Sequence, residues 1–340
     1  MKAMVYYGAK TVKFENVPEP EVKPGTVKLK VKYAGICGTD LHVYRGEKKI
    51  NARIPNILGH EFTGEIIELG EGVTQYKVGD RVVVENFWGC GECIYCKEGE
   101  YYACQRLEAY GLQHPGGFAE YVVVREDKLF LLPDQLSYEI AAVIEPTSVA
   151  MQAVKSSPLK IGDKVAIFGA GPLGSLIAQC AKAAGASQII VVEKQEKRRH
   201  LALEMGADFI IDPNKEDPVK KIYEITRDGV DVAYDAAGFQ ETFVAALDSI
   251  KPKGELMVAA VFAESVSYMP FLQQKGVKKI NTTRGNYNMF PKVIDLLVKG
   301  SIVVDPIITS QISLEHIDEL GFKKLVSGEG ECKIIVSPEK

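Results

Sequence analysis

Short hydrophobic runs separated by glycine and proline dominate the first 145 positions of the chain. Residues 27–31 alternate between Val or Leu and Lys, and residues 81–84 read Arg-Val-Val-Val. Alternation with a period of two is typical of a half-buried β-strand, and frequent glycine and proline mark turns. The N-terminal residues 1–7 have the pattern of a strand as well. The first part of the chain is therefore predicted to be a β-rich unit of short strands.

The pattern changes at about residue 163, where strand-like runs begin to alternate with helical periodicity. The hydrophobic runs in this part are residues 164–168, 188–192, 230–234 and 256–261. Strands that alternate with helices are typical of a parallel sheet with crossover helices. Beyond residue 305 the pattern is mixed again, and it ends in a short strand at 333–336. We therefore predict two units, the second of them α/β.

Length, composition and charge narrow the class of protein. The chain has 340 residues, of which 46% are hydrophobic and 25% charged, the balance of a globular protein of roughly two domains. No run approaches the roughly 18 apolar residues of a membrane-spanning helix. The N-terminus lacks the apolar core and cleavage site of a signal peptide, so we expect a cytoplasmic protein. The net charge is −4 and the basic residues are scattered, which makes nucleic acid a poor partner.

A glycine motif opens the α/β part. Residues 169–174 read Gly-Ala-Gly-Pro-Leu-Gly, follow a predicted strand directly and precede a segment with helical spacing. In such a turn the first glycine permits the tight bend, and the second lets the backbone approach a pyrophosphate. The third allows close helix–strand packing, and the helix N-terminus attracts the anion. The predicted dinucleotide-binding residues of the motif are Gly169, Gly171, Leu173 and Gly174.

An acidic residue follows the second predicted strand. Glu193 stands nineteen positions after Gly174. A carboxylate at this place accepts hydrogen bonds from the adenosine ribose, and its charge repels a 2′-phosphate. This predicts NAD in preference to NADP. Arg198 and Arg199 stand close enough to complicate that preference, and Arg198 is itself a candidate cofactor-binding residue.

Four of the seven cysteines fall within fifteen residues. They are Cys90, Cys93, Cys96 and Cys104. Four thiolates at such spacing can close a tetrahedron around Zn²⁺ and leave no position open for chemistry, which predicts a structural zinc site. The alternatives are free or disulfide-paired cysteines, or an iron–sulfur cluster.

Three dispersed residues form a second candidate metal site. Cys37, His60 and Glu145 together offer one thiolate, one imidazole and one carboxylate. Such a set can hold Zn²⁺ and leave a position for water or substrate, as in catalytic sites. Their spacing does not establish that they meet, and by residue type alone a lone Cys or His is more often a core residue than a ligand.

Several segments together resemble one family. They are residues 34–42 (Ala-Gly-Ile-Cys-Gly-Thr-Asp-Leu-His), 59–61 (Gly-His-Glu), 78–82, 116–121, the four-cysteine segment and the glycine motif. Through them the chain resembles the zinc-dependent medium-chain dehydrogenase/reductase (alcohol dehydrogenase) family over nearly its whole length. The resemblance implies a GroES-like catalytic domain formed by residues 1–148 and 286–340. A doubly wound parallel-sheet Rossmann domain, residues 149–285, would lie between them. It also implies that Cys37 and His60 bind a catalytic zinc.

The resemblance adds two carboxylates to this zinc. Glu145 stands before Pro146, as in the sorbitol and 2,3-butanediol dehydrogenases, whereas ethanol-type enzymes usually have Cys and threonine dehydrogenases tend to have Asp-Pro. In related enzymes the Glu after the zinc-binding His approaches the metal or exchanges with water. Glu61 is therefore a conditional ligand, and its alternative is a supporting carboxylate.

The implied reaction is hydride transfer between a secondary alcohol and NAD, which gives the ketone. Zinc would stabilise the alkoxide, and Thr39 would pass the hydroxyl proton through the cofactor ribose to His42. Glu145 is an alternative carrier of the proton, through zinc-bound water. The simpler interpretations are a helix cap for Thr39 and a surface histidine for His42.

The predicted substrate is a vicinal diol or polyol, such as 2,3-butanediol or sorbitol. Val43 stands where sorbitol dehydrogenases have Tyr, and Gly285 stands where they have a substrate-contacting Arg, with Arg284 one position off. Both departures favour the shorter diol. The nearest alternative is L-threonine 3-dehydrogenase, and one from another class is a non-catalytic NAD-binding redox sensor. Relatives form dimers and tetramers, so we expect a homo-oligomer.

Overall fold

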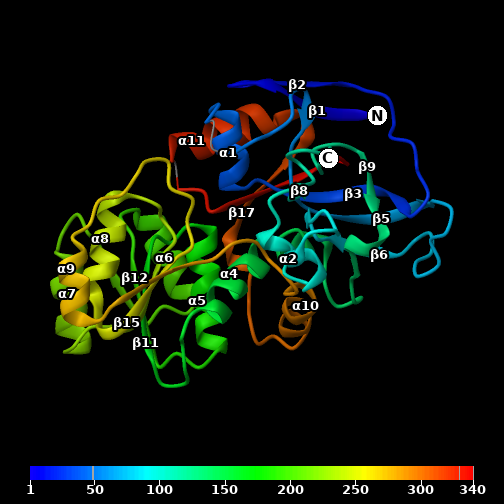
Figure 1. Ribbon diagram of the computed structural model, residues 1–340. Coiled ribbons are helices and arrows are strands. Elements are labelled where there is room, and N and C mark those ends of the chain that lie inside the picture. The colour runs from blue at the N-terminus through cyan, green and yellow to red at the C-terminus, as the bar shows by residue number, and fades with distance from the viewer. Residues whose placement is uncertain (48–49, 329, 340) are drawn as a thin grey trace. The chain divides into compact units, whose positions relative to one another are not determined.

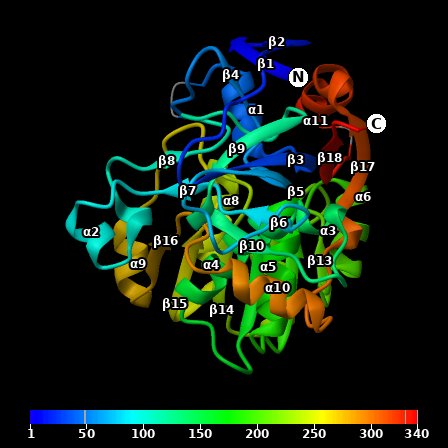
Figure 2. The same ribbon diagram turned by 90° about the vertical axis from the view of Figure 1, so that its right-hand side faces the viewer.

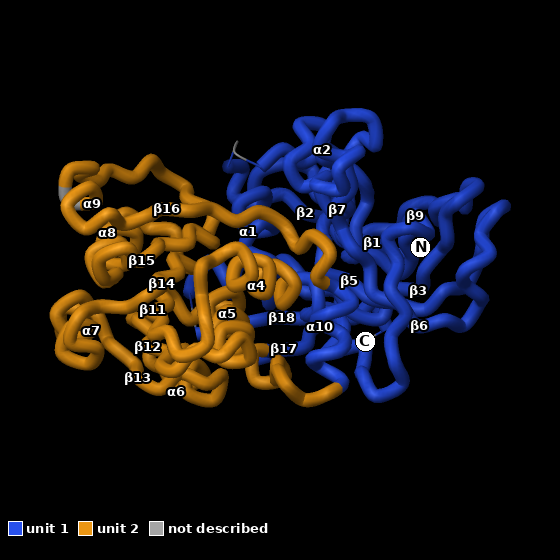
Figure 3. Tube along the Cα trace, turned by 60° about the horizontal axis from the view of Figure 1, so that its bottom comes forward, with its two compact units in different colours: residues 1–145, 290–298, 308–340 blue, residues 146–289, 299–307 orange. Residues whose placement is uncertain are grey.

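The chain forms two compact units (Figure 3). The computed structural model describes residues 1–47, 50–328 and 330–339. Unit 1 comprises residues 1–145, 290–298 and 308–340, and unit 2 comprises residues 146–289 and 299–307. The boundaries expected from the sequence, 148/149 and 285/286, differ from these by a few residues. They also left the segment 299–307 in the first domain.

Unit 1 is built around a seven-stranded sheet (Figure 1). Its strands run in the order β10 (Leu129–Leu131), β6 (Arg81–Val84), β5 (Glu61–Leu69), β3 (Thr26–Gly35), β18 (Lys333–Ser337) and β17 (Ile308–Ser313), and β9 (Tyr121–Arg125) also pairs with β3. Val27, Leu29 and Val31 of β3 are fully buried, as its period of two requires. The predicted β-rich unit is therefore confirmed.

Smaller elements complete unit 1. A three-stranded sheet contains β2 (Thr11–Asn16), β1 (Lys2–Gly8) and β4 (Asn56–Ile57), and a two-stranded sheet contains β7 (Phe87–Trp88) and β8 (Glu108–Ala109). The α-helices are α1 (Gly38–Tyr44), α2 (Ile94–Lys97), α3 (Tyr138–Ala141), α10 (Phe290–Val298) and α11 (Lys324–Ser327), and Ile317–Lys323 is a π-helix. Short 3₁₀ turns are Tyr101–Ala103, Glu126–Lys128 and Leu314–His316, and a further one, Asp305–Ile307, belongs to unit 2. Helix α4 (Ile144–Ser156) begins at the end of unit 1 and continues in unit 2.

Unit 2 is a six-stranded sheet in which all strands are parallel. The strand order is β13 (Phe209–Ile211), β12 (Gln188–Val192), β11 (Lys164–Phe168), β14 (Val230–Asp235), β15 (Ile250–Val258) and β16 (Lys279–Thr282). The helices are α5 (Pro172–Ala183), α6 (Glu196–Glu204), α7 (Pro218–Thr226), α8 (Gln240–Ser249) and α9 (Pro270–Gly276). Helices α5 and α6 lie on one face of the sheet, and α7 and α8 lie on the other (Figure 1). This is the doubly wound Rossmann order, as predicted.

The fourth predicted strand of unit 2 was misplaced. The sequence pattern indicated residues 256–261, whereas β15 begins at Ile250 and ends at Val258. Pro252 and Gly254 hide its beginning, because neither is typical of a strand. At its end, the N–H groups of Ala259 and Ala260 both donate to the carbonyl of Asp235, which turns the chain out of the sheet.

Among the described residues, the helices are too short or too polar to cross a membrane.

Candidate active site

Two groups of potential metal ligands occur among the described residues, and both lie in unit 1. The first, here called the mixed cluster, comprises Cys37, His60 and Glu61, whose ligand atoms lie within 4.8 Å of one another. Cys37 follows β3 and is the N-cap of α1, while Glu61 is the first residue of β5. These elements meet because β3 and β5 are antiparallel partners, with Gly35 opposite Glu61.

A buried lysine adjoins the mixed cluster. The Nζ atom of Lys333 donates to Oε1 and Oε2 of Glu61 at 2.9 and 2.7 Å, and to the carbonyl of Ile36 at 3.0 Å. Lys333 is 1% exposed and Glu61 is fully buried. Burial lowers the pKa of Lys333, but the negative charges of Glu61 and Cys37 raise it further than burial lowers it. The ammonium therefore stays charged and balances part of the negative charge of the cluster.

Gly35 makes room for this ion pair. A Cβ atom at Gly35 would lie 2.1 Å from Oε2 of Glu61. Lys333 was not predicted from the sequence, because it stands at the first position of an apolar strand, where a charged residue is usually at the surface. The only signal was a lysine at the start of a strand whose next three residues are apolar.

Asp40 lies beside the histidine of the cluster. This fully buried carboxylate accepts from the N–H of Cys37 at 2.9 Å and from the N–H of Gly59 at 3.3 Å, and its Oδ1 lies 3.4 Å from Nδ1 of His60. With Nδ1 facing Asp40, Nε2 is the nitrogen left for a metal. Carboxylates commonly support metal-binding histidines in this way. Asp40 was also missed, although its place in the first turn of α1, three residues after Cys37, was a usable signal.

Protonation of the His60 ring competes with metal binding. Burial lowers the pKa of His60, but the charges of Asp40 and Cys37 outweigh it and raise the pKa well above its ordinary value. Metal binding would therefore release a proton from His60, as is usual for metal-binding histidines.

Glu145 lies outside the mixed cluster. It is buried in the first turn of α4, and its negative charge acts on the ammonium of Lys333. The ligand atoms that gather within 4.8 Å of one another include an oxygen of Glu61 instead. The structure thus brings the conditional ligand to Cys37 and His60, and Glu145 as a ligand stays a prediction.

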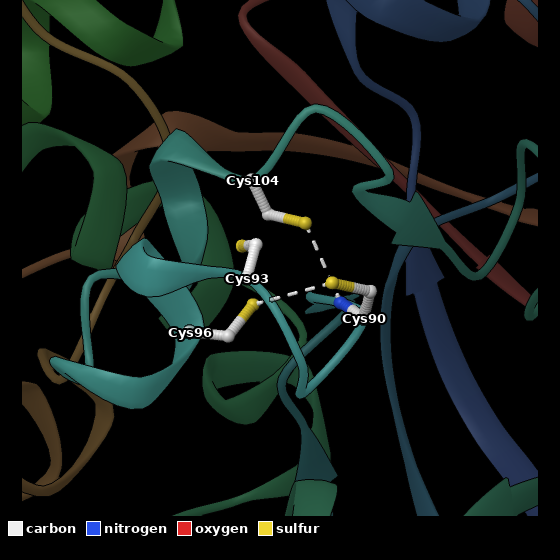
Figure 4. A group of neighbouring side chains, drawn as sticks. All are labelled: Cys90, Cys93, Cys96 and Cys104. Atoms are coloured by element: carbon white, nitrogen blue, oxygen red, sulfur yellow. Dashed lines mark hydrogen bonds between the residues drawn. The ribbon is translucent and has the colours of Figure 1, made fainter.

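The second group is the four-cysteine lobe, residues 90–104. The sulfur atoms of Cys90, Cys93, Cys96 and Cys104 lie within 4.8 Å of one another, and Figure 4 shows the four side chains gathered beside helix α2. None of the four forms a disulfide bond. Hydrogen bonds from the backbone of Glu92 and Cys93 lower the pKa of Cys90 to about 6, which favours the thiolate form that binds metals.

The lobe stands out from the strands of unit 1 (Figure 2), and its Tyr101 contacts a buried ion pair beside those strands. The ammonium of Lys128 lies 2.9 Å from Oε2 of Glu85, and both side chains are buried. The hydroxyl of Tyr101, inside the lobe, donates to Oε1 of Glu85, and Lys128 also lies 4.5 Å from the centre of the Tyr101 ring.

The two sets of donor atoms suit different kinds of zinc site. Four sulfurs from one short segment suit a closed tetrahedral zinc site with no vacancy. One sulfur, one imidazole nitrogen and a carboxylate suit a zinc site whose fourth position stays open. The first set is the chemistry of a structural metal and the second that of a catalytic metal.

The glycine turn lies in unit 2, between β11 and α5, and its three glycines meet different surroundings. Gly169 has a φ of +96°, and a Cβ at Gly174 would lie 1.9 Å from the carbonyl oxygen of Gly169. At Gly171 the nearest atom to such a Cβ is Nη1 of Arg198 at 3.8 Å, so the backbone there faces open space. Leu173 is the second residue of α5 and is partly buried.

Glu193 lies directly over this turn. Its Oε2 accepts from the N–H of Ala170 and its Oε1 from the N–H of Gln195, both at 2.8 Å, and the side chain is buried. The carboxylate is thereby fixed at the end of β12 beside the glycines. Arg198 follows in α6 and brings its guanidinium to Gly171, while Arg199 is paired with Asp212 at 3.2 Å.

Thr39 and His42 lie on α1. The N-cap of this helix is Cys37, so Thr39 is a residue of the first turn and does not cap it. His42 lies in the last turn. Residues three apart share one face of a helix, so both side chains are on the same side of α1. Both are partly buried.

Comparisons with known proteins agree with this architecture. Residues 23–134 match the alcohol dehydrogenase GroES-like domain, and residues 172–299 match the zinc-binding dehydrogenase domain. The (R,R)-butanediol dehydrogenase of Bacillus subtilis is 40% identical, over 99% of this chain and 100% of the relative. The chain belongs to the zinc-dependent medium-chain dehydrogenase/reductase family.

Other members of the medium-chain dehydrogenase/reductase family are similar too. The crystal structure of the Bacillus subtilis 2R,3R-butanediol dehydrogenase superposes with a TM-score of 0.93, over 99% of both chains. Sorbitol dehydrogenase of Bacillus subtilis is 37% identical over 100% of this chain and 98% of the relative. L-threonine 3-dehydrogenase of Pyrococcus furiosus is 39% identical over 91% of this chain and 89% of the relative. The predicted family and enzyme class are confirmed, and the relatives span diol, polyol and amino-acid substrates.

Proposed function

We propose that this dehydrogenase oxidises a secondary alcohol of a vicinal diol or polyol to the ketone, with zinc and NAD as cofactors. The mixed cluster carries the proposal, because Cys37, His60 and one carboxylate would leave one position of a tetrahedral zinc open. When bound, the metal supplies a Lewis acid and the dinucleotide a hydride acceptor. The four-cysteine lobe would hold a second, structural zinc.

The chain offers two carboxylates for the third place at the catalytic metal. Glu61 belongs to the mixed cluster and is held by Lys333, and Glu145 is buried close enough to act on the same ammonium. Thr39 and His42 would carry the hydroxyl proton away along one face of α1. Glycine residues 169, 171 and 174, with Leu173, Glu193 and Arg198, would bind the dinucleotide.

The substrate is tested with a panel of alcohols. We expect the highest kcat/KM for a 2,3-butanediol isomer and lower values for sorbitol and xylitol, because Gly285 stands where sorbitol dehydrogenases have a substrate-contacting Arg. Val43 is 2% exposed and packs in the core of unit 1, so it does not contribute to this expectation. NADH formation from each alcohol and from L-threonine is the measurement. Activity with L-threonine alone would establish the alternative dehydrogenase. A protein that binds NAD and oxidises none of the panel would favour the redox sensor.

The cofactor preference is tested at Glu193. Replacing the buried carboxylate by Glu193→Ser removes a charge that would face a 2′-phosphate, so the ratio of kcat/KM with NADP to that with NAD should rise by at least about ten-fold. Glu196→Ser, an exposed residue three positions on, is the matched control and should leave the ratio unchanged. An unchanged ratio in Glu193→Ser would mean that this carboxylate does not face the ribose.

We also infer an oligomer formed through unit 2. Strand β16 is the last strand of the parallel sheet, and its four residues are all exposed. Phe271 and Val277 nearby are 66% and 62% exposed. Exposed apolar strand edges are usually covered by another chain or protected by charge. Light scattering should therefore give a multiple of the chain mass, and Ile280→Lys on β16 should reduce it.

A further inference from the structure

The end of helix α1 brings a carboxylate onto His42. The helix ends at Tyr44, Arg45 is its C-cap, and Gly46 follows with a φ of +77°. The N–H of Gly46 donates to the carbonyl of Val43, and the N–H of Glu47 donates to the carbonyl of His42 at 3.0 Å. These two bonds define a Schellman motif, in which the side chains of the residues at the His42 and Glu47 positions usually touch through a hydrophobic contact.

Here the contact is polar. Nδ1 of His42 lies 2.7 Å from Oε2 of Glu47, and the other carboxylate oxygen, Oε1, lies 3.8 Å from the guanidinium of Arg45. Gly46 is required for this geometry twice over, since its φ is positive and a Cβ there would lie 2.6 Å from Cβ of Ala9. The turn therefore holds Glu47 in one place relative to the imidazole.

The contact decides which nitrogen of His42 carries the hydrogen. An ionised carboxylate can only accept a hydrogen bond, so Nδ1 of the neutral ring is the donor and Nε2 is left with a free lone pair. A base can take up a proton only through such a lone pair. Glu47 thus fixes both the orientation and the tautomer of the ring, as the aspartate of a catalytic triad does for its histidine.

We propose that Glu47 is the positioning residue of the proton relay, which keeps Nε2 of His42 ready to accept the proton that leaves the substrate. The proposal rests on the function proposed above. In the step itself the O–H bond of the alcohol breaks and an Nε2–H bond forms on His42. Thr39 would carry the proton between them, together with the ribose of the cofactor when it is bound. His42 then returns the proton to water. Both side chains are partly exposed, at 19% for His42 and 28% for Glu47, so water can reach the pair.

A second histidine provides an internal control. His114 lies 2.8 Å from a carboxylate oxygen of Glu108, but through Nε2, and the two side chains are 42% and 49% exposed. The same argument gives His114 the opposite tautomer, with the hydrogen on Nε2. Two-bond ¹⁵N–¹H NMR correlations of the histidine rings distinguish the two tautomers, and His42→Gln assigns the relevant signals.

The expected result has two parts. In the wild-type protein the His42 ring should show hydrogen on Nδ1, and Glu47→Gln should convert it to a mixture of tautomers, because an amide can donate as well as accept. Glu47→Gln and Glu47→Ala should each lower kcat by about ten-fold, a part of the roughly 10²–10⁴-fold that general acid–base catalysis contributes. KM for NAD should not change. Glu108→Gln should alter the His114 signal alone and leave kcat unchanged.

Three results would overturn the proposal. One is a wild-type His42 ring with hydrogen on Nε2. Another is an unchanged tautomer in Glu47→Gln. The third is a tautomer that changes while kcat does not, which would make the contact merely structural. If the wild-type protein oxidises an alcohol but the His42 ring does not show the expected tautomers, only this inference is wrong. If it oxidises no alcohol, the proposed function is wrong and the relay with it, whatever the tautomer.

Discussion

The two candidate metal sites of unit 1 are assembled by opposite means. The four-cysteine lobe uses one residue type from fifteen consecutive positions, and its Tyr101 donates a hydrogen bond to Glu85 beside the strands. The mixed cluster uses different residue types from separate elements, and 272 positions separate Glu61 from Lys333, its hydrogen-bond partner.

The difference concerns what holds each site together. In the lobe few apolar side chains are buried, so the metal itself would supply most of the order, as in small zinc domains. In the mixed cluster the sheet places the donors, and buried groups such as Asp40 and Lys333 hold them before any metal arrives. Loss of a metal ligand should therefore unfold the lobe locally, whereas loss of a ligand in the mixed cluster should lower catalytic activity without unfolding the protein.

The sharpest test compares Cys37→Ser with Cys93→Ser. Cys37→Ser should lower kcat/KM by at least about 10³-fold, because a catalytic Lewis acid is worth several kcal/mol, and should leave the circular dichroism spectrum unchanged. Cys93→Ser should retain activity in the molecules that remain folded, but should make residues 90–104 susceptible to proteolysis. The contrast breaks down if a well-folded Cys93→Ser protein loses as much activity as Cys37→Ser.

The buried ion pairs of the two sites can be compared directly. Lys333→Met should lower the free energy of unfolding by about 3–5 kcal/mol, because it leaves the buried Glu61 carboxylate without a partner. Lys128→Met should cost less, since Glu85 keeps the hydrogen bond from Tyr101. Urea unfolding followed by Trp88 fluorescence in unit 1 measures both. Lys333→Arg, which keeps the charge, should recover part of the loss, and equal costs for the two methionine variants would contradict this account.

The smallest expected effect concerns the hydrogen bond from Tyr101 of the lobe to Glu85. Tyr101→Phe removes one hydrogen bond to Glu85 and should destabilise unit 1 by about 1 kcal/mol. It should also speed proteolysis within the lobe. The exposed Tyr95, five positions after Cys90, provides the control, and Tyr95→Phe should change neither quantity. If both variants behave alike, the contact with Glu85 does not anchor the lobe.

Local patterns predicted the fold well. The strands at 164–168 and 188–192 were located to the residue, because buried parallel strands are continuous apolar runs bounded by turn residues. The short strands β13 and β16 were not predicted. The first, Phe-Ile-Ile, is only three residues long and too short to show a period, and the second is exposed on every residue and carries no hydrophobic pattern.

In the candidate site too, the features set by nearby residues were predicted and those set by distant residues were not. The proximity of the four cysteines and the geometry of the glycine turn follow from spacing within one loop, since a few intervening residues limit how far apart their atoms can be. The roles of Asp40, Glu47 and Lys333 were not predicted. Each depends on a partner whose identity the residue's own neighbourhood does not reveal.

The sequence by itself therefore determined the two units, the parallel sheet, the glycine turn and the sulfur-rich lobe, because each arises from contacts between residues close along the chain. Tertiary structure alone decided that His60 and Glu61 meet Cys37, and that Lys333 reaches them from the far end of the chain. The reason is sheet register. Gly35 of β3 pairs with Glu61 of β5 and with Ile335 of β18, and only hydrogen bonding between distant strands brings those three positions together.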